Sequence, residues 1–288
     1  MKRSEILAST VAWPSCALGA WSAAWLAGRC SPDDVIEALA ESADRHEVRW
    51  DPTSTAGESG SAAHGSANGV LDLLGLLRPA RGLLVRLPST GDPQGLPPHA
   101  ATSAALLAGE VMLVDDESAS GTLALVPEVS LDHLDALGDD PRHLTCRWTV
   151  YRYDAPLDLG HLVSAGPSAG DLEHELRQAV RDAATIIGGL NGRRAVDATD
   201  LRAHLATLTA RHRVTMPPHA LDARATRLID TAAQVEAIVD LANLRNAEIG
   251  DSAGQWDSGD SALRGLQTLA RTARAAAVNQ TIVELQRR

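Results

Sequence analysis

The sequence predicts an α+β fold, in which a small mixed or antiparallel sheet with helices is followed by a C-terminal array of four helices. Two observations predict it. Short apolar or alternating runs between residues 47 and 153 are bounded by turn-forming residues, as is typical of strands. From Asp171 onward, apolar residues recur every three or four positions, as is typical of amphipathic helices. We therefore expect an α+β domain over residues 1–157 and a helical domain over residues 158–288.

The N-terminal stretch from Ile6 to Gly28 carries no charge, which raises the question of a signal peptide or membrane anchor. Glu5 precedes this stretch and Pro14 interrupts it, so we expect a pair of core helices instead. Three of the six tryptophans lie in this stretch. We expect them to fill the core of a chain that lacks phenylalanine, the alternative being a stacking platform for a flat ligand: Trp13, Trp21 and Trp25.

Start signals and alternating runs place the other elements of the first 157 residues. Ser31 before Pro32 predicts a helix over about 32–44, because serine caps a helix and proline suits its first turn. A short helix is expected at 70–77, and residues 51–67 have the composition of a mobile loop. The predicted strands are 47–50, 82–87, 110–115, 122–126 and 145–153, the third and fourth forming a hairpin.

In the second half of the sequence, start signals and apolar periodicity predict helices that begin near residues 169, 199, 217 and 258. The last two are separated by a polar loop at 250–257 and predict a long antiparallel hairpin over 217–287. Further apolar residues lie off the hairpin seam and need a second surface, either other helices of this chain or a partner chain. They are Ile229, Ile238, Leu241, Val278, Ile282 and Leu285.

Composition and charge exclude some function classes. The chain has 288 residues, with 37 acidic and 26 basic side chains and a net charge of -11. A binder of nucleic acid or of an anionic membrane needs a cationic surface, so we expect neither partner. Three cysteines without a paired CxxC motif indicate reduced thiols and a cytoplasmic location.

The loop over residues 88–99 is the candidate ligand site. It holds four prolines and two glycines directly after a predicted strand, which gives it a fixed shape. Polar loops at strand ends often hold ligands. The alternative is that the prolines cover a sheet edge, or cap the helix that begins near residue 100, with an Asx turn in the loop. The candidate ligand-binding residues are Arg86, Ser89, Thr90, Asp92 and His99.

Acidic residues are concentrated between Arg86 and Arg142, where no lysine or arginine occurs. We expect a solvated acidic face, which keeps the protein soluble or meets a basic partner. The alternative is a Mg²⁺ or Ca²⁺ site in the stretch 110–140, with His133 or His143 nearby, but no EF-hand spacing is present. The acidic residues of this stretch are Glu110, Asp115, Asp116, Glu117, Glu128, Asp132, Asp135, Asp139 and Asp140.

Two further motifs invite a catalytic or metal interpretation. Residues 166–170 match the G-x-S-x-G nucleophile elbow, but a poor strand precedes them, so Ser168 is better explained as a helix N-cap. His212 could meet His204 or His219 in the folded chain, yet two histidines without a placed carboxylate are a weak metal signal. We therefore expect no metal and no cofactor, and catalytic residues stay unassigned.

Four short segments resemble an uncharacterised family of proteins from high-GC actinobacteria, and the likeness covers most of the chain. The central feature is a GDPxGLP loop after a strand. The family has no assigned reaction, cofactor or partner, so the resemblance implies a cytoplasmic location and no catalytic residue. The segments are Val85-Arg86-Leu87-Pro88, Gly91-Asp92-Pro93 with Gly95-Leu96-Pro97, Ala108-Gly109-Glu110-Val111, and Arg147-Trp148-Thr149-Val150.

These observations favour a non-enzymatic cytoplasmic interaction or scaffold protein, homodimeric through its C-terminal helices or bound to a protein partner. The alternative is a small-molecule-binding protein or enzyme that uses the loop 88–99, with Arg86 as an anion anchor and Asp92 and His99 as an acid/base pair. The sequence does not decide whether the protein is an enzyme.

Overall fold

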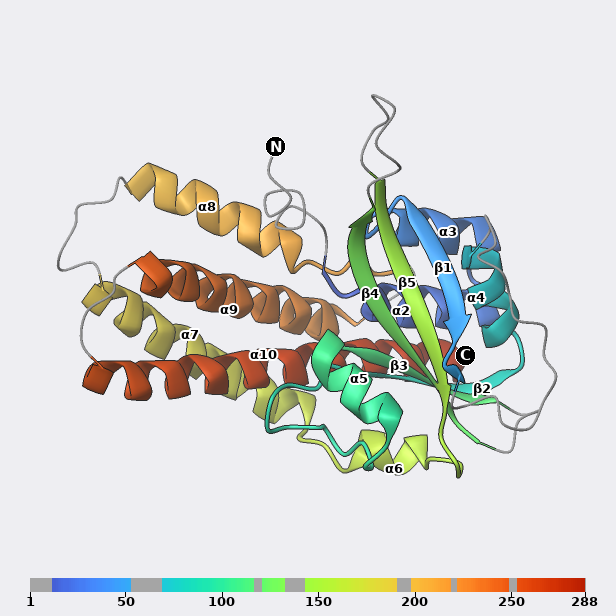
Figure 1. Ribbon diagram of the computed structural model, residues 1–288. Helices are drawn as coiled ribbons and strands as arrows, with labels where there is room; N and C mark the ends of the chain where they lie inside the picture. The colour runs from blue at the N-terminus through green and yellow to red at the C-terminus, as the bar shows by residue number, and fades with distance from the viewer. Residues whose placement is uncertain are drawn as a thin grey trace.

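The structure is a computed structural model that describes residues 12–52, 69–116, 121–132, 143–190, 198–218, 222–248 and 253–287. One five-stranded mixed sheet has helices on both faces, and a group of long helices extends to one side of it (Figure 1). This arrangement confirms the predicted α+β class and the C-terminal helices. The predicted mobile loop 51–67 lies, from residue 53 on, outside the described residues.

The sheet has the strand order β1-β5-β4-β3-β2. Strands β2 to β5 form an antiparallel meander, and β1 adds to its edge parallel to β5. The predicted strands are confirmed, and β4 extends six residues further than expected. The bounds are β1 Arg45–Trp50, β2 Ala80–Arg86, β3 Val111–Asp116, β4 Leu123–Asp132 and β5 His143–Arg152.

One face of the sheet packs against α2 (Pro14–Leu26), α3 (Pro32–Ala40) and α4 (Gly69–Leu77). Ser31 caps α3 as predicted, because its hydroxyl accepts the N–H of Asp34 while the Asp34 carboxylate accepts the N–H of Ser31. The helix ends at Ala40, short of the predicted 44. Ser42 closes it there by donating both its N–H and its hydroxyl to the carbonyl of Leu39.

The other face is covered over β2 to β4 by α5 (Ala100–Ala108) and α6 (Leu159–Ser164). A small core lies between them, built from alternate residues of these strands such as Leu84, Leu113 and Ala124. The part of this face that belongs to β1 and β5 carries polar side chains instead, including Arg49 and Arg147. The sheet therefore has one face covered by helices and one face that is only half covered.

The C-terminal part contains α7 (Ala169–Leu190), α8 (Ala198–Arg211), α9 (Ala223–Glu248) and α10 (Ala253–Gln286), and α9 and α10 form the predicted antiparallel hairpin (Figure 1). Helix α9 begins at Ala223 rather than near 217, because the Asp222 carboxylate accepts the N–H of Arg224 and so caps the helix there (N–O 2.8 Å). Helix α10 begins at Ala253 rather than near 258, so residues 253–257 of the predicted polar loop are helical.

The apolar residues that lie off the hairpin seam are covered within this chain. Ile229, Val278 and Ile282 are each at most 2% exposed and belong to a core cluster that also contains side chains of α2 and the sheet. The second surface that these residues require is therefore provided by other elements of the same chain.

Helix α10 is attached to the sheet by an amide that replaces a neighbouring strand. The Asn279 Oδ1 atom accepts the N–H of Val85 (2.8 Å), and its Nδ2 atom donates to the carbonyl of Val85 (2.9 Å). This pairing satisfies the outer edge of β2, where backbone groups would otherwise be unpaired. Gly19 of α2 lies against the same region, and a Cβ atom there would come within 2.8 Å of the Val85 side chain. The three elements therefore meet at close range.

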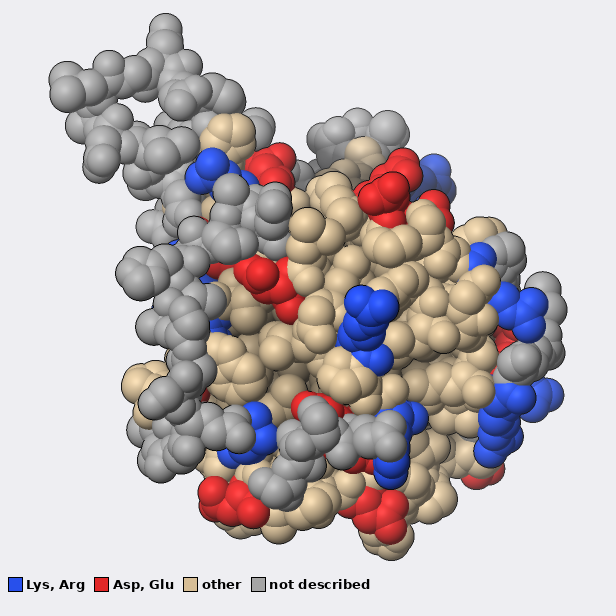
Figure 2. Space-filling view, turned by 90° about the vertical axis from the view of Figure 1, so that its right-hand side faces the viewer, with Lys and Arg blue, Asp and Glu red and all other residues tan. Residues whose placement is uncertain are grey.

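Surface charge is mixed where the molecule is viewed from the side of α3, α4 and β2. Basic and acidic side chains are interspersed there and do not gather into one large patch of a single sign (Figure 2). Among the helices of the described ranges, none combines the length and the apolar character needed to cross a membrane.

The Asn279 pairing gives a test of the attachment of α10. Asn279→Leu keeps the side-chain volume but leaves two buried backbone groups of Val85 without partners, so we expect a loss of about 2–4 kcal/mol in the free energy of unfolding. Urea denaturation measures this loss. Gln286→Leu makes the same kind of change at an exposed position of α10 and should stay within about 0.5 kcal/mol of wild type. Equal effects of the two substitutions would contradict the assigned role of Asn279.

Candidate functional site

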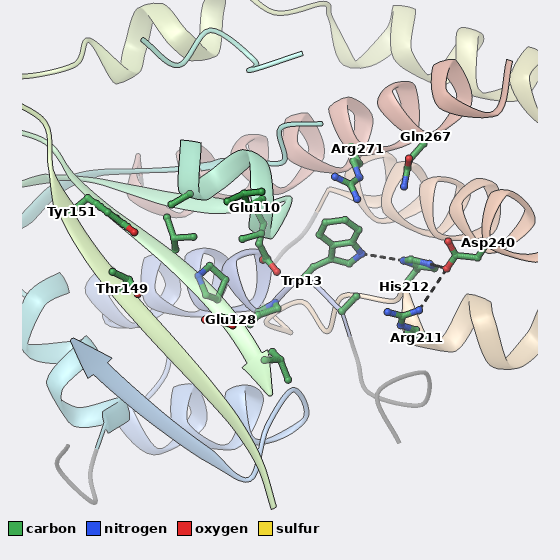
Figure 3. Close-up of a pocket in the computed structure, with 18 of the residues that line it drawn as sticks. Trp13, Glu110, Glu128, Thr149, Tyr151, Arg211, His212, Asp240, Gln267 and Arg271 are labelled. Carbon is green, nitrogen blue, oxygen red and sulfur yellow. Dashed lines mark hydrogen bonds and ion pairs between the residues drawn. The ribbon is translucent and has the colours of Figure 1, made fainter. Parts of the chain in front are cut away.

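A pocket of about 670 Å³ lies where the sheet meets the C-terminal ends of α5 and α8 and the sides of α9 and α10 (Figure 3). It exists because β3 and β4 differ in length. Their pairing stops at Leu125, and β4 continues to Asp132 paired with β5 alone. Pro127 lies in this one-sided part of β4, as expected of a residue that has no N–H to donate to a second strand. The gap beside β4 is bordered by Trp13 and Glu110.

Trp13 borders the pocket in a strained conformation. Its φ and ψ angles are 73° and 48°, in the left-handed region that a large side chain rarely adopts. The ring is 6% exposed, and the guanidinium carbons of Arg271 and Arg274 lie 5.1 Å and 4.7 Å from its centroid. Its Nε1–H donates to Nδ1 of His212 (3.3 Å). Three side chains therefore hold the ring in place, and strain of this kind persists only where surrounding contacts fix it.

His212 connects Trp13 to Asp240. The indole N–H can only donate, so Nδ1 of His212 accepts, and the ring proton belongs on Nε2. Nε2 then donates to the Asp240 carboxylate (2.8 Å). Both ring nitrogens are thus engaged by neighbouring side chains, and Nδ1 also lies 3.5 Å from the Glu236 carboxylate. The arrangement positions side chains and does not present a general base.

A buried ion network lies behind Trp13. The Arg274 guanidinium, fully buried, donates to the Glu236 carboxylate and to the carbonyl of His212 (3.2 Å). Nε of Arg271 lies 3.6 Å from the same carboxylate. Arg271 also approaches Gly109, where a Cβ atom would come within 2.9 Å of the guanidinium at a φ of +80°, so glycine is required there. Two arginines therefore share one glutamate in a site removed from water.

Glu110 is buried at the pocket wall, so the prediction that it belongs to a solvated acidic face is wrong for this residue. Its side chain is 7% exposed, and Oε2 accepts the N–H of Ser15 (2.8 Å). This bond satisfies the first turn of α2, because Trp13 at the N-cap has no oxygen that could do so. Burial raises the pKa of Glu110 to about 7, and the Ser15 bond and the nearby arginines act in the opposite direction.

The residues predicted in the loop 88–99 do not converge on one site. Ser89 and Asp92 exchange backbone hydrogen bonds, and the Ser89 hydroxyl bonds that of Thr268 on α10 (3.0 Å). The Asp92 carboxylate accepts the N–H of Gln94 (2.9 Å), which closes an Asx turn. Thr90 and Asp92 line a second cavity of about 500 Å³ beside α7 and α10.

Arg86 and His99 lie apart from that cavity. The Arg86 guanidinium donates to the carbonyl of Leu162, and burial lowers the pKa of Arg86. Nδ1 of His99 accepts the N–H of Ala101 (3.1 Å) at the start of α5, and its ring lies 4.7 Å from that of Tyr153. These contacts agree with the alternative prediction, in which the loop has a structural role. The loop caps α5 and attaches to α10.

The other sequence motifs are placed as follows. Ser168 accepts the N–H of Asp171 (3.2 Å) and so caps α7, as predicted, and the short helix α6 precedes it where a nucleophile elbow needs a strand. In the described part of the chain no three His, Cys, Asp or Glu residues gather as a metal site would require. Residues 133–140 of the acidic stretch, together with Glu117 and His219, lie outside the described residues.

The pocket itself was missed by sequence reasoning. The sequence predicts Trp13 as a core residue and gives His212 only a weak metal signal. Neither prediction includes the hydrogen bond that joins the two side chains. A signal was present in the helices: Glu236 and Arg274 each stand among small or apolar residues, where a charge needs a partner. Their pairing across 38 positions follows from the hairpin, whereas the contribution of Trp13 needs the three-dimensional structure.

Comparison with known proteins assigns the chain to a family. Models of the N-terminal and C-terminal domains of Rv1486c-like proteins match residues 15–159 and 170–275. The chain belongs to the Rv1486c-like family. It is 34% identical to the uncharacterised protein Rv1486c of Mycobacterium tuberculosis and 31% identical to the uncharacterised protein ML1804 of Mycobacterium leprae, each match covering 92% of this chain and 96% of the relative. No solved structure matches.

Membership of the Rv1486c-like family confirms the resemblance to an uncharacterised actinobacterial family. The pocket draws on both matched regions: Glu110 and Tyr151 lie in the first, and His212, Asp240 and Arg271 lie in the second.

The raised pKa of Glu110 predicts how stability changes with pH. In the unfolded chain this glutamate ionises near 4.5, whereas in the folded chain it keeps its proton up to about 7. The folded state therefore binds more protons in this window, so stability falls as the pH rises from 4.5 to 7, by on the order of 3 kcal/mol. Glu110→Gln keeps an acceptor for Ser15 and cannot ionise, so the variant should be more stable than wild type at pH 8.

Urea denaturation at pH 5, 6, 7 and 8 measures this difference. Glu128→Gln, at a side chain 67% exposed on the same pocket, serves as the control and should follow wild type. A constant offset between Glu110→Gln and wild type at all four pH values would show that Glu110 does not titrate in this window.

Proposed function

We propose that the protein binds a small organic molecule in the pocket between the sheet and the helices. The volume of about 670 Å³ falls in the range of sites for such molecules. Its walls combine apolar side chains, such as Leu107, Val126 and Val129, with polar and charged ones distributed along the pocket (Figure 3). This lining suits a ligand that has both apolar and polar groups.

The observation that carries the proposal is the strained conformation of Trp13 at the pocket wall. A left-handed tryptophan costs on the order of 1–3 kcal/mol, and such strain is concentrated at ligand sites and active sites. Here the strain coincides with a ring fixed by Arg271, Arg274 and His212. A rigid wall lowers the entropy lost on binding. The geometry supports binding rather than acid–base catalysis, because both nitrogens of His212 are engaged.

A cytoplasmic location is part of this proposal. It is supported by the three cysteines, which are free thiols as a reducing compartment would keep them: Cys16, Cys30 and Cys146.

An interaction or scaffold role, with homodimerisation through the C-terminal helices, is the second proposal. It rests on Leu244, which is 50% exposed on α9, although a single exposed leucine is also common on monomeric proteins. The apolar residues off the hairpin seam do not support it, since other elements of the same chain cover them.

The binding proposal is tested by obstructing the pocket. Ala104 of α5 lines it, and the neighbouring Ser103 is exposed and does not. We expect a thermal-shift screen against organic acids, nucleotides, sugars and amino acids to yield compounds that stabilise wild type by about 5 °C when present at one hundred times their dissociation constant. Ala104→Trp should abolish the shift, and Ser103→Trp should retain it. Compounds that stabilise both variants equally would bind elsewhere and contradict the proposal.

The dimer proposal is tested by sedimentation equilibrium over 1–100 µM. Leu244→Gln should shift a wild-type dimer towards monomer by at least tenfold in dissociation constant. Leu71→Gln is the matched control, because Leu71 is also 50% exposed but lies on α4. A wild-type protein that is monomeric at 100 µM would rule out this proposal.

A further inference from the structure

We propose that the ligand of this pocket carries a carboxylate, and that Arg211 and Gln267 bind it. This inference rests on the proposed function and deepens it by naming the chemical class. The inference compares two groups of polar side chains that face the pocket. Some already make hydrogen bonds within the protein, and others make none to a described residue.

Arg211 is the pocket arginine with unused donors. It is the last residue of α8, and its side chain is 34% exposed. Its one ion pair among the described residues joins NH1 to the Asp240 carboxylate at 3.7 Å, too long for a hydrogen bond, and the same oxygen accepts from His212. Within the described ranges its guanidinium makes no hydrogen bond, and its Nε is buried without a partner. A guanidinium has five N–H donors, and leaving a buried one unpaired is unfavourable.

The other pocket arginines each make a hydrogen bond within the fold, although Nε of Arg271 is also buried without one. Nε of Arg49 donates to the hydroxyl of Thr149 (2.9 Å), and Arg271 donates to the carbonyl of Pro88 (3.0 Å). Both bonds attach a side chain to a neighbouring element of the fold. Arg211 has no such structural bond from its guanidinium among the described residues, so it is the arginine available to a ligand.

Gln267 lies at the same end of the pocket as Arg211. Figure 3 shows the two side chains coming from α10 and α8, on either side of the pair formed by His212 and Asp240. The described residues offer the Gln267 amide no hydrogen-bond partner either. A guanidinium fork donates two parallel hydrogen bonds to the two oxygens of a carboxylate, and an amide N–H₂ can donate a third.

The charges around this end favour an anion over a cation. Arg49 is paired with Glu128, and Arg211 with Asp240, so each pair is neutral. Arg271 and Arg274 share the single carboxylate of Glu236, which leaves one positive charge near Trp13. Glu110 is the remaining acid of the pocket, and burial favours its neutral form. A ligand carboxylate would compensate the unmatched charge.

The opposite end and the walls define the rest of the ligand. The hydroxyl of Tyr151 faces the pocket and has no hydrogen bond to another described residue, so it can take a polar group. Ala104, Leu107 and Val126 supply apolar surface to the pocket wall. The site therefore suits an elongated acid with an apolar or aromatic body.

The test compares carboxylates with their own primary amides, which have the same shape and no charge. The probes are 4-phenylbutyrate with 4-phenylbutyramide, and indole-3-butyrate with indole-3-butyramide, titrated by calorimetry at pH 6.5. We expect wild type to bind each carboxylate at least tenfold more tightly than its amide. Arg211→Gln should weaken carboxylate binding at least tenfold and leave amide binding unchanged, and Arg211→Lys should lie between. Arg213→Gln, at an exposed arginine two residues further on, should match wild type.

The outcomes separate this inference from the function on which it rests. Equal binding of acid and amide by wild type, or carboxylate binding that survives Arg211→Gln, overturns the carboxylate assignment and leaves the binding pocket in place. If neither these probes nor any compound of the thermal-shift screen binds wild type, the proposed function is overturned as well. The comparison of acid with amide needs no variant, so it stands even if Arg211→Gln fails to fold.

Discussion

The architecture depends on how one long helix is attached to the sheet. Helix α10 contacts α7, α9, α2 and β2, and its Asn279 amide stands in for the strand that β2 lacks on its outer side. A side chain can replace a strand in this way only if it carries both a donor and an acceptor, as an amide does. Arg271 and Arg274, on the same helix, extend the attachment to the loop after β2 and to Trp13.

The pocket is a consequence of that attachment together with the unequal lengths of β3 and β4. A sheet edge left open beside β4 would be filled by apolar side chains in an ordinary core. Here the opening is bordered by Trp13, whose ring is fixed from three sides, and by Glu110, which caps α2. The polar groups that hold this wall mostly bond one another, although Glu236 Oε1 and the Nε atoms of Arg271 and Arg274 are buried without a hydrogen bond among the described residues. The side chains of Arg211, Gln267 and Tyr151 face the open space and make no hydrogen bond to a described residue, and the proposed binding site rests on this difference.

Buried charge limits what the site can do chemically. The bond from Trp13 fixes the tautomer of His212 and occupies the nitrogen that would act as a base. The same network keeps the His212–Asp240 pair rigid at one end of the pocket. The ionisable groups around Trp13 therefore fix the geometry of the pocket wall.

The sequence by itself determined the class of fold and nearly every element. Alternation located the five strands, capping residues such as Ser31 and Ser168 located helix starts, and apolar periodicity located the α9–α10 hairpin. These signals are local, so they are written in consecutive residues. The boundaries that were wrong, at α3, α9 and α10, depended on capping bonds from Ser42 and Asp222 or on helix propagation through a polar segment.

Only the tertiary structure decided where a site lies. Trp13, Glu110, Arg211 and Asp240 are far apart in the sequence, and each has an ordinary local context. They meet because α10 holds the sheet against the helical hairpin and β3 stops short beside β4. The loop 88–99 attracted attention for its composition, yet its polar groups are used to attach it to α10 and to cap α5. A residue's chemistry is set by its partners, and partners across long sequence separations are fixed only when the chain folds.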